Sequence, residues 1–577
     1  MQYKRIRGEK YIWSVSEPDV SVLEIAARYN LSIPVARAIV HRGYTDSDSI
    51  NDYLFGMLGR DLPDPRLMKD AVRAVERIRL AIERGEKILI SGDYDVDGIT
   101  AASLMMACLG PLGAQVNFFL PHRVRDGYGL STHVIERAAH NGYKVVITVD
   151  NGITAFEPAL RARELGIDLI ITDHHRVQGA VPEAYAVVNP NQSDCTYPYK
   201  LFAGVGVIFK VLTILYQQLG RPMPAKAYEL LLLGTVADVV PLTGENRFWV
   251  RQGLQKVNSE HSLSLAALKM NARVQKPKLS STDVGFSIAP QINALGRLDD
   301  ARQGVAFLLG SDSVAVEEIG RTLWRLNQTR KEVEKSVLND IISQIEVGSI
   351  SKEDRMLLAT GKNWPPGVIG LVASRLVGLY GRPALIFHET TNGVLKGSCR
   401  SIAACNIFDA LSWCKDLLIT FGGHSQAAGL SLKKENFGEL KKRLYAYASK
   451  HLKPEDFEQR LMIDSPALLS DFTKKFVDDL EYLEPFGHQN PEPLFLVHNV
   501  TLTQPPQLLK ELHAKAYLFS NGVVKPVIFF NRPDIFERLC VATGPFHVAV
   551  QVKENYWNDS VSVELTGMDI SFEGVAS

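Results

Sequence analysis

The chain has 577 residues, of which 46% are hydrophobic and 22% are charged, a composition typical of soluble globular proteins. This length is too great for one hydrophobic core, so we expect about three or four domains. The formal net charge is zero, and residues 455–577 carry 18 acidic and 9 basic side chains, which excludes a general basic coat as the means of binding nucleic acid.

Neither a membrane segment nor a targeting segment is evident. No apolar run reaches the ~18 residues of a spanning helix, and the initial Met-Gln-Tyr-Lys-Arg is not followed by the apolar core of a signal peptide. The six cysteines lack Cys-x-x-Cys spacing, so no zinc site or disulfide framework is indicated. We therefore expect a cytoplasmic protein with reduced thiols and no membrane association.

The first half of the chain predicts a helical extension and then an α/β domain. Residues 1–60 should form helices at 21–29 and 32–42 that pack on the domain at 61–312. That domain alternates apolar strands with helices, which predicts a parallel sheet covered on both faces. The expected strands are 87–91, 115–120, 144–149 and 168–172, and the expected helices are 99–109, 131–141 and 156–165.

Acidic residues follow four apolar runs of this domain, each interpreted as a strand. The run at 87–90 precedes three alternate carboxylates, and the others precede an Asp-Asn-Gly, an Asp-His-His and, after Leu230–Leu233, a Gly-Thr-Val-Ala-Asp sequence. A single Asp after a strand is often only a turn or cap residue. Four such groups at one sheet edge instead predict a ligand site. The residues are Asp93, Asp95, Asp97, Asp150, Asp173, His174, His175 and Asp238.

The donor types indicate which ligand this site would hold. Crowded carboxylates repel one another by about 4 kcal/mol per pair at ~4 Å, so either protons or cations must be present. Carboxylates with imidazoles suit Mn²⁺ or Mg²⁺ better than a thiolate-rich zinc or iron site does. Four contributing segments favour two ions, the arrangement used for displacement at a phosphate ester.

The second half predicts a long helix and two further domains. Residues 313–348 have a helical pattern with one interior glycine and are predicted to connect two domains. A second α/β domain is expected at 349–452, where Gly422 and Gly423 precede His424 in a turn suited to contact with a phosphate or a base. Residues 453–577 contain five short strand-like runs, which indicate a small β-barrel of the OB type.

Several segments resemble, in order, motifs of the DHH phosphoesterase superfamily, and most closely its bacterial RecJ family of single-stranded-DNA exonucleases. The flanking sequences strengthen the resemblance more than Asp-His-His alone, and together they cover roughly residues 62–430. The segments are Asp95-Val-Asp97-Gly98, Asp150-Asn-Gly152, Asp173-His174-His175, Gly234-Thr-Val-Ala-Asp238, Arg125-Asp-Gly-Tyr-Gly-Leu130, Ala203-Gly-Val-Gly206, Asn293-Ala-Leu-Gly-Arg-Leu-Asp299, Leu326-Asn-Gln-Thr-Arg330 and Phe421-Gly-Gly-His424.

The resemblance implies roles for individual residues. Asp95, Asp97, Asp150, His174 and Asp238 would hold two cations, with Asp150 bridging them, while Asp93, Asp173 and His175 would orient them or act as additional ligands. Phosphate contacts would come from Arg123 and Arg297. The alternative for Arg123 is a place on the solvated surface, and the alternative for Arg297 is a structural salt bridge to Asp299. The domain at 349–452 resembles DHHA1, with His424 facing the metals. Its other candidate substrate contacts are Gly422, Gly423, Ser374, Arg375, Lys396, Ser398 and Arg400.

The function implied by this resemblance is a metal-dependent 5′→3′ exonuclease that degrades single-stranded DNA to 5′ mononucleotides in DNA repair and recombination. Its implied partners are single-stranded DNA, a single-stranded-DNA-binding protein and a RecQ-type helicase, and we expect a monomer. One alternative is a small DHH phosphoesterase acting on short oligonucleotides or cyclic dinucleotides, which generally lacks the barrel expected here. Another is a non-catalytic replication scaffold, which intact metal motifs disfavour.

Overall fold

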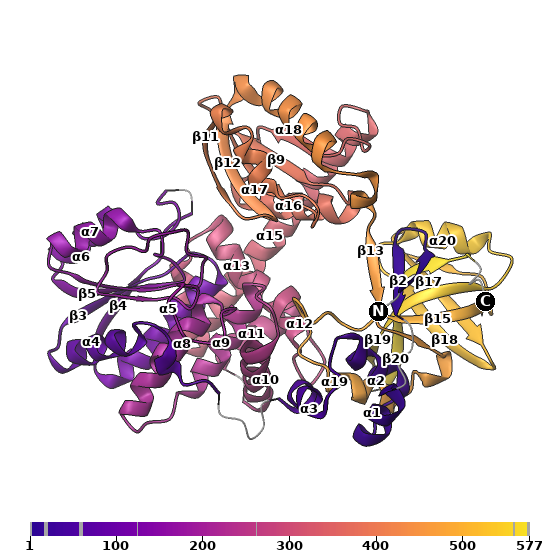
Figure 1. Cartoon of the computed structure of the whole chain (residues 1–577), viewed down its shortest axis with the longest axis horizontal. Coiled ribbons are helices and arrows are strands. Elements are labelled where there is room, and N and C mark those ends of the chain that lie inside the picture. Colours follow the sequence, from indigo (N-terminus) through magenta and orange to yellow (C-terminus); the bar gives the residue numbers. More distant parts are fainter. Residues whose placement is uncertain are drawn as a thin grey trace. The chain divides into compact units, whose positions relative to one another are not determined.

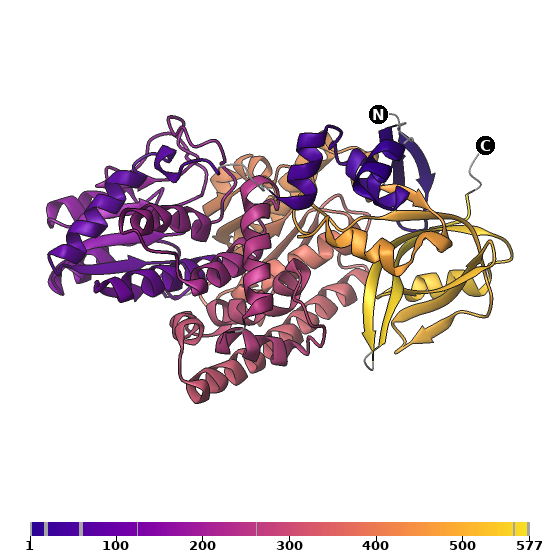
Figure 2. The same ribbon diagram turned by 90° about the horizontal axis from the view of Figure 1, so that it is seen from below.

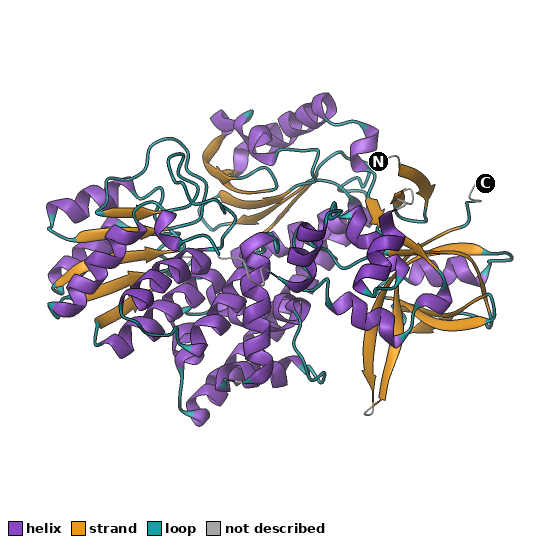
Figure 3. Cartoon of the chain, turned by 60° about the horizontal axis from the view of Figure 1, so that its bottom comes forward, coloured by secondary structure: helices purple, strands orange, loops and turns teal. Residues whose placement is uncertain are grey.

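The computed structural model describes residues 3–16, 21–56, 62–123, 125–260, 262–557 and 560–573. Contacts divide the chain into two compact units, one mainly of residues 15–324 with 463–572 and the other mainly of residues 325–462 with 5–14. Helices and strands alternate in the α/β parts, and the C-terminal part is rich in strands (Figures 1 and 3). Of the helices that the structure describes, none combines the length and apolar character needed to cross a membrane.

The N-terminal region is not entirely helical, which corrects the expectation from the sequence. Strands β1 (Tyr3–Arg7) and β2 (Ile12–Ser16) precede helices α1 (Ser21–Tyr29), α2 (Ile33–His41) and α3 (Ser47–Phe55), and β2 also pairs with β13 (Arg460–Ile463). The buried side chains of Trp13 and Val15 alternate with less buried ones, which is the two-residue period of a strand. A helical interpretation was therefore wrong for residues 3–7 and 12–16.

The expected packing of these helices on the α/β domain is only part of what the structure shows, because α3 contacts α10 (Gly244–Ser259) there while the helices also enter another core. Buried residues of α1 to α3, such as Ile39 and Leu54, share one hydrophobic core with residues of the C-terminal segment such as Phe476 and Phe529. The backbone N–H of Ser32 donates to the carboxylate of Asp479, in the same C-terminal segment, at 2.7 Å. The extension therefore completes the core of the C-terminal domain.

A five-stranded parallel sheet of order β4-β3-β5-β6-β7 forms the α/β domain, which confirms the predicted parallel sheet and adds β7 to the four expected strands. Helices α6 and α7 lie on one face, and α4, α5 and α8 lie on the other (Figure 1). The carboxyl ends of β3, β5 and β6 consequently meet at one edge. The bounds are α4 (Ala71–Glu83), β3 (Lys87–Ser91), α5 (Val96–Leu109), β4 (Gln115–Phe119), α6 (Thr132–His140), β5 (Tyr143–Val149), α7 (Phe156–Glu164), β6 (Asp168–Thr172), β7 (Ala186–Val188) and α8 (Gly204–Gln218).

Helices follow the sheet, and one of them corrects a predicted strand. Leu230–Leu233 lie inside α9 (Ala225–Ala237), where all four leucines are buried. A helix that is apolar on all sides cannot be told from a buried strand over so short a run. The remaining bounds are α10 (Gly244–Ser259), α11 (Leu263–Ala272), α12 (Ser281–Asp283), the π-helical turn η3 (Val284–Ile288), α13 (Ala289–Leu298), α14 (Arg302–Leu309) and α15 (Ser313–Glu346).

The second unit holds a five-stranded sheet of order β11-β12-β10-β9-β8. Gly422 and Gly423 end strand β11, and the backbone N–H of His424 donates to Ala427 at 2.8 Å in the turn that leads to β12. The bounds are β8 (Leu357–Gly361), α16 (Pro366–Tyr380), β9 (Ala384–Glu389), β10 (Val394–Arg400), α17 (Ile407–Ser412), β11 (Leu418–Gly423), β12 (Ala427–Lys433) and α18 (Phe437–His451).

The C-terminal segment forms a curved sheet of order β14-β15-β19-β20-β18-β17-β16, and an additional pairing between β15 and β17 closes it into a barrel (Figure 2). This confirms the predicted OB-type domain, with more strands than expected. The bounds are β14 (Ser465–Ala467), α19 (Lys474–Glu481), β15 (Phe495–Leu502), β16 (Gln507–Leu509), β17 (His513–Ser520), β18 (Val523–Phe529), α20 (Pro533–Cys540), β19 (Phe546–Trp557) and β20 (Ser560–Ser571).

A buried arginine of α10 joins three parts of the first unit. Arg247 is 5% exposed and donates to the carbonyl of Tyr53 in α3 at 2.9 Å and to those of Tyr482 and Leu483 after α19 at 3.2 and 3.0 Å. Its guanidinium also lies over the Tyr53 ring, 4.2 Å from the centroid. A cation at two helix C-termini complements both helix dipoles, so this residue ties the N-terminal helices and the barrel to the α/β domain.

One carboxyl group in the link between α19 and β15 should make stability depend on pH. Burial, together with Glu481, Glu492 and Asp283, raises the pKa of Glu484 to about 7, against the opposing charge of Lys276. The contribution of this carboxyl group to the free energy of unfolding is then fully present below pH ~4.5 and is lost as pH rises through ~7. We expect Glu484→Gln to stabilise the protein at pH 8 by on the order of 2 kcal/mol and to have little effect at pH 4.5. Urea denaturation at both pH values measures this.

The exposed Glu537 of α20 supplies the control, because Glu537→Gln removes the same charge from a helix surface and Glu537 is not among the charges that act on Glu484. Equal changes in the two variants, or a change for Glu484→Gln that is the same at both pH values, would contradict the expected burial effect.

Candidate metal centre

Three acids of the β3–α5 connection occupy different local positions. Asp93 lies in the loop, Asp95 is the N-cap of α5 and accepts from the backbone N–H of Gly98 at 3.1 Å, and Asp97 lies in the first turn. Asp93 and Asp97 are 3% and 1% exposed. Carboxylates are favoured at a helix N-terminus by its dipole, which explains how α5 accommodates two of them.

Asp97 also binds the start of another helix. Its carboxylate accepts from the backbone N–H groups of Gly204 at 2.5 Å and Val205 at 2.9 Å, at the N-terminus of α8. The Ala203-Gly-Val-Gly206 segment therefore serves to fix a carboxylate of the site.

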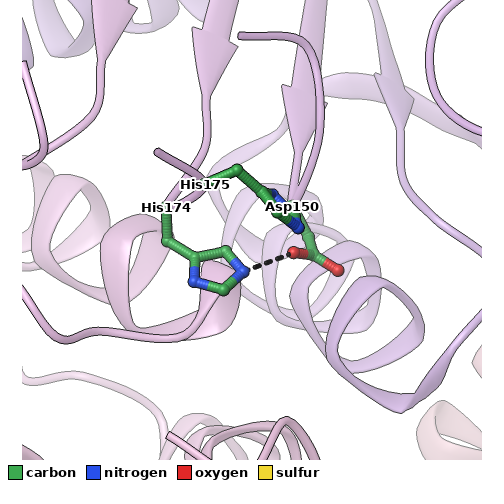
Figure 4. Close-up of side chains that lie close together, drawn as sticks. All are labelled: Asp150, His174 and His175. Carbon is green, nitrogen blue, oxygen red and sulfur yellow. Dashed lines mark ion pairs between the residues drawn. The ribbon is translucent and has the colours of Figure 1, made fainter. Parts of the chain in front are cut away.

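Asp150 and His174 come from the ends of β5 and β6. His174 Nε2 lies 3.1 Å from Asp150 Oδ1, 3.6 Å from Asp238 Oδ2 and 4.0 Å from Asp97 Oδ2. Figure 4 shows how Asp150, His174 and His175 lie together, with the Asp150–His174 ion pair as a dashed line. Asp238 is the C-cap of helix α9, so it reaches the site from a helix end and not from a strand end.

Asp173 binds the loop instead of pointing into the group. It is 1% exposed and accepts from the backbone N–H groups of Ile153, His174 and His175 at 2.9, 2.7 and 3.1 Å and from His175 Nδ1 at 2.7 Å. Burial raises its pKa, but the hydrogen bonds and charges of its neighbours outweigh that effect and lower the pKa overall. An ionised Asp173 thus orients the His175 ring.

The donors form three overlapping groups in which potential ligand atoms lie within 4.8 Å of one another. Asp150 belongs to two groups and His174 to two, so these two residues link the three groups. The groups are Asp150 with His174 and His175, Asp97 with His174 and Asp238, and Asp93 with Asp95 and Asp150. Asp93 and His175 thus stand among the potential ligands.

Hydrogen bonding and charge test whether a cation fits. Asp93 Oδ1, Asp238 Oδ2 and His174 Nε2 are buried without a hydrogen-bond partner among the described residues. Burial and mutual repulsion raise the pKa of Asp93, Asp150 and Asp238 far above the usual range and that of Asp97 to about 7. Burial also lowers the pKa of His174 to about 4, which favours the neutral, ligating imidazole. The oxygen-rich set fits Mn²⁺ or Mg²⁺.

Glycines let the backbones of this region approach each other, a feature that sequence reasoning missed. A Cβ on Gly204 would lie 2.5 Å from Asp150 Cβ, and one on Gly98 would lie 2.6 Å from the Asp93 backbone. A Cβ on Gly234 would lie 3.0 Å from Asp97 Oδ1. Three segments distant in sequence thus need glycine to bring the acids together.

Two arginines lie beside the acids in the first unit. Arg123 Nε donates to the carbonyl of Gly296 at 3.1 Å, and its guanidinium lies 4.1 Å from the Tyr94 ring centroid. Arg297 directly follows Gly296. Burial raises the pKa of Tyr94, and the positive charges of Arg123 and Arg297 lower it, so both arginines lie near this tyrosine. A Cβ on Gly296 would lie 2.0 Å from the Tyr94 carbonyl oxygen. The structure therefore brings both arginines to the loop that carries Asp93 and Asp95.

The remaining candidate residues lie in the second unit. Arg375 pairs with Glu334, while Arg400 donates to Cys399 O at 2.8 Å and Ser374 donates to Gly370 O at 3.1 Å. A Cβ on Gly370 would lie 2.9 Å from Ser398 Oγ. Helix α16 and strand β10 thus gather these polar groups on one side of the unit; their roles, like those of Gly422, Gly423 and His424, stay predictions.

The hydrogen bonds of Asp173 predict a measurable effect on metal binding. An Asp173→Asn amide cannot accept all four hydrogen bonds, so His175 loses its fixed orientation. We expect Mn²⁺ affinity to fall about 10- to 100-fold in isothermal titration calorimetry. Asp194→Asn removes an exposed carboxylate paired with Lys69 and should leave the affinity unchanged. Unaltered Mn²⁺ affinity in Asp173→Asn would show that these bonds do not support the ligands.

Three family models match parts of the chain. They are the DHH family, N-terminal domain, at residues 87–235, the DHHA1 domain at 353–450 and the RecJ OB domain at 463–569. The matched ranges correspond to the parallel sheet with all of the potential metal ligands except Asp238, to the sheet of the second unit and to the C-terminal barrel.

Named relatives match most of the chain. The single-stranded-DNA-specific exonuclease RecJ of Bacillus subtilis is 34% identical, over 97% of this chain and 70% of its own. That of Escherichia coli is 36% identical, over 80% of this chain and 83% of its own. The crystal structure of RecJ in complex with Mn²⁺ from Thermus thermophilus superposes with a TM-score of 0.83 at 28% identity, covering 98% of this chain and 80% of that one.

Proposed function

The chain belongs to the RecJ family of single-stranded-DNA-specific exonucleases, and on this basis we propose that its metal centre hydrolyses single-stranded DNA in the 5′→3′ direction and releases 5′ mononucleotides. The observation that carries the proposal is the set of three overlapping donor groups that share Asp150 and His174. The proposed cofactors are two divalent cations, Mn²⁺ or Mg²⁺, and the proposed role is in DNA repair and recombination.

The acids and imidazoles would have two kinds of role, to hold the cations or to orient the residues that hold them. Asp95, Asp97, Asp150, His174 and Asp238 would hold the cations, with Asp150 shared, while Asp93 and His175 would complete or orient the ligand set. When bound, divalent cations activate water and neutralise the charge that develops on the phosphoryl oxygens. Helix α8 and the glycine contacts keep the carboxylates in place before substrate arrives.

Substrate would be held by groups that bind phosphate. Arg123 and Arg297 lie next to the loop of Asp93 and would grip the terminal phosphate, because guanidinium binds phosphate through two parallel hydrogen bonds. In the second unit, the DNA backbone would be contacted by the remaining candidate residues, which are Gly422, Gly423, His424, Ser374, Arg375 and Arg400. Neutral overall charge means that these placed groups, and not a general basic surface, supply the attraction.

The barrel supports this function over that of a small DHH phosphoesterase. Single strands bind OB domains through a groove with stacking side chains, and the RecJ OB domain match covers this part of the chain. We further propose that the protein acts as a monomer in the cytoplasm, and that a single-stranded-DNA-binding protein and a RecQ-type helicase are its partners.

The test uses 5′-labelled and 3′-labelled single-stranded DNA and a matched duplex, with Mn²⁺, Mg²⁺ or EDTA. We expect immediate release of 5′ mononucleotide from the single strand only, and none in EDTA. Cleavage confined to di- to pentanucleotides would instead identify a small phosphoesterase. DNA binding without any cleavage would identify a scaffold.

A further inference from the structure

An exposed phenylalanine lies on a helix beside the metal centre and has no role in the chemistry described above. Phe286 is 82% exposed. It lies in η3, a π-helical turn that leads into α13. One exposed apolar side chain by itself is ordinary on a protein surface, but this one lies in a π-helical turn, an element that occurs frequently at functional sites.

The position of this turn is fixed against the element that carries Asp238. A Cβ on Gly285 would lie 3.4 Å from Val236 Cγ1, and the backbone N–H of Val239 closes a turn onto Val236 at 3.3 Å. Asp238 lies within that turn. Phe286 therefore adjoins the end of α9 that contributes a potential metal ligand.

Val239 adds an independent sign of function at this place. It has φ 60°, a left-handed conformation that is strained for a β-branched residue, and its side chain is 64% exposed. Val239 directly follows Asp238, and Gly285, the neighbour of Phe286, packs on Val236, so two exposed apolar residues belong to segments that meet at the end of α9.

Helix α13, which follows η3, carries the candidate phosphate-binding residue Arg297 at its C-terminal end. Residues that are not buried on η3 and α13 include Phe286, Pro290, Asn293 and Arg297, at spacings of four, three and four, so they share one face. Gly296 contacts the Tyr94 backbone at the Asp93 side of the site. This partly buried face thus runs from the Asp238 side to the Asp93 side, a length of about 16 Å at ~1.5 Å per residue.

We propose that Phe286, flanked by Val239, is a stacking platform for a base on the 3′ side of the scissile phosphate. This inference rests on the proposed function, in which Arg297 holds the 5′ terminal phosphate and the metal centre lies at the first phosphodiester. A single-stranded DNA that lies along the face of α13 and η3, with its 5′ phosphate at Arg297, then reaches Phe286 with its second or third base. Stacking on an aromatic side chain tolerates every base, which suits an enzyme without sequence preference.

The experiment uses the full chain and 5′-phosphorylated tetranucleotides that carry an abasic residue at the first, second, third or fourth position. Binding is measured by stopped flow with Ca²⁺ before cleavage. Phe286→Trp keeps an aromatic ring and reports stacking by fluorescence. We expect quenching by the normal tetranucleotide that is lost when the second or third position is abasic.

Phe286→Leu gives the complementary result. We expect affinity to fall about ten-fold, with no further loss for abasic substrates, while wild type and Phe286→Trp remain sensitive to them. Phe55→Leu, which alters an aromatic residue 43% exposed on helix α3, should match wild type on these substrates. Release of 5′ mononucleotide from long 5′-labelled single-stranded DNA by wild type verifies the proposed function separately.

Two outcomes would overturn the inference while the exonuclease function stands. One is wild-type affinity and wild-type abasic sensitivity in Phe286→Leu. The other is tryptophan fluorescence in Phe286→Trp that is the same for normal and abasic tetranucleotides. This second measurement does not need the leucine variant, so it decides the question even if Phe286→Leu folds poorly.

Discussion

Asp150→Asn is expected to reduce release of 5′ mononucleotides by about 10³-fold, with the fold intact. Two cations contribute several kcal/mol to the displacement, and each ~1.36 kcal/mol corresponds to a factor of ten in rate. Asp150 belongs to two of the three donor groups, so an amide there weakens both cation positions. Asparagine also tolerates the φ of 62° at this position, whereas alanine would add backbone strain. Turnover and Mn²⁺ titration together measure the effect.

The matched control is Asp70→Asn, because Asp70 has φ 60° and accepts from the backbone N–H of Val187 at 2.9 Å, a bond that an asparagine oxygen can retain. It should keep both activity and Mn²⁺ binding. Full activity in Asp150→Asn would refute the shared-carboxylate arrangement, and lost activity with normal Mn²⁺ binding would place Asp150 in substrate positioning instead.

Gly204→Ala is expected to lower turnover about 10²-fold without replacing a single polar group. The added Cβ would meet Asp150 Cβ at 2.5 Å and Asp150 Cα at 2.8 Å, so the carboxylate or helix α8 must move. Asp97 moves with the helix, because it accepts from the Gly204 and Val205 N–H groups. A displacement of about 1 Å is enough for a loss of this size. Steady-state kinetics at saturating Mn²⁺ measure it.

Gly438→Ala provides the control within a helix, because nothing lies within 4 Å of a Cβ at Gly438 in α18. It should keep wild-type turnover and equal or exceed wild-type stability, since alanine favours helix over glycine. Wild-type kinetics in Gly204→Ala, with a melting temperature also unchanged, would mean that the α8 contact does not set the geometry of the acids.

The sequence was sufficient where local pattern and parallel topology decide the outcome. Strands at 87–91 and 168–172 were predicted with the observed bounds, because buried parallel strands are continuous apolar runs. Their carboxyl ends must meet at one sheet edge, so Asp95, Asp97 and His174 could be placed together from chain order alone. The C-terminal barrel was predicted in the same way from short alternating runs.

Only the tertiary structure could decide features that depend on contacts between distant segments. Asp238 arrives from the end of helix α9, because a short run of leucines has no periodicity that separates a buried helix from a strand. Nothing local in Gly204 reveals that Asp150 packs against it, or in Ile39 that it shares a core with Phe529 of the barrel. The sequence by itself determined which acids and imidazoles follow the strands and can lie together at one sheet edge, since side-chain type and strand order are local properties. The close approach of helices to those residues was decided by packing, which depends on the shapes of surfaces that meet only in the folded chain.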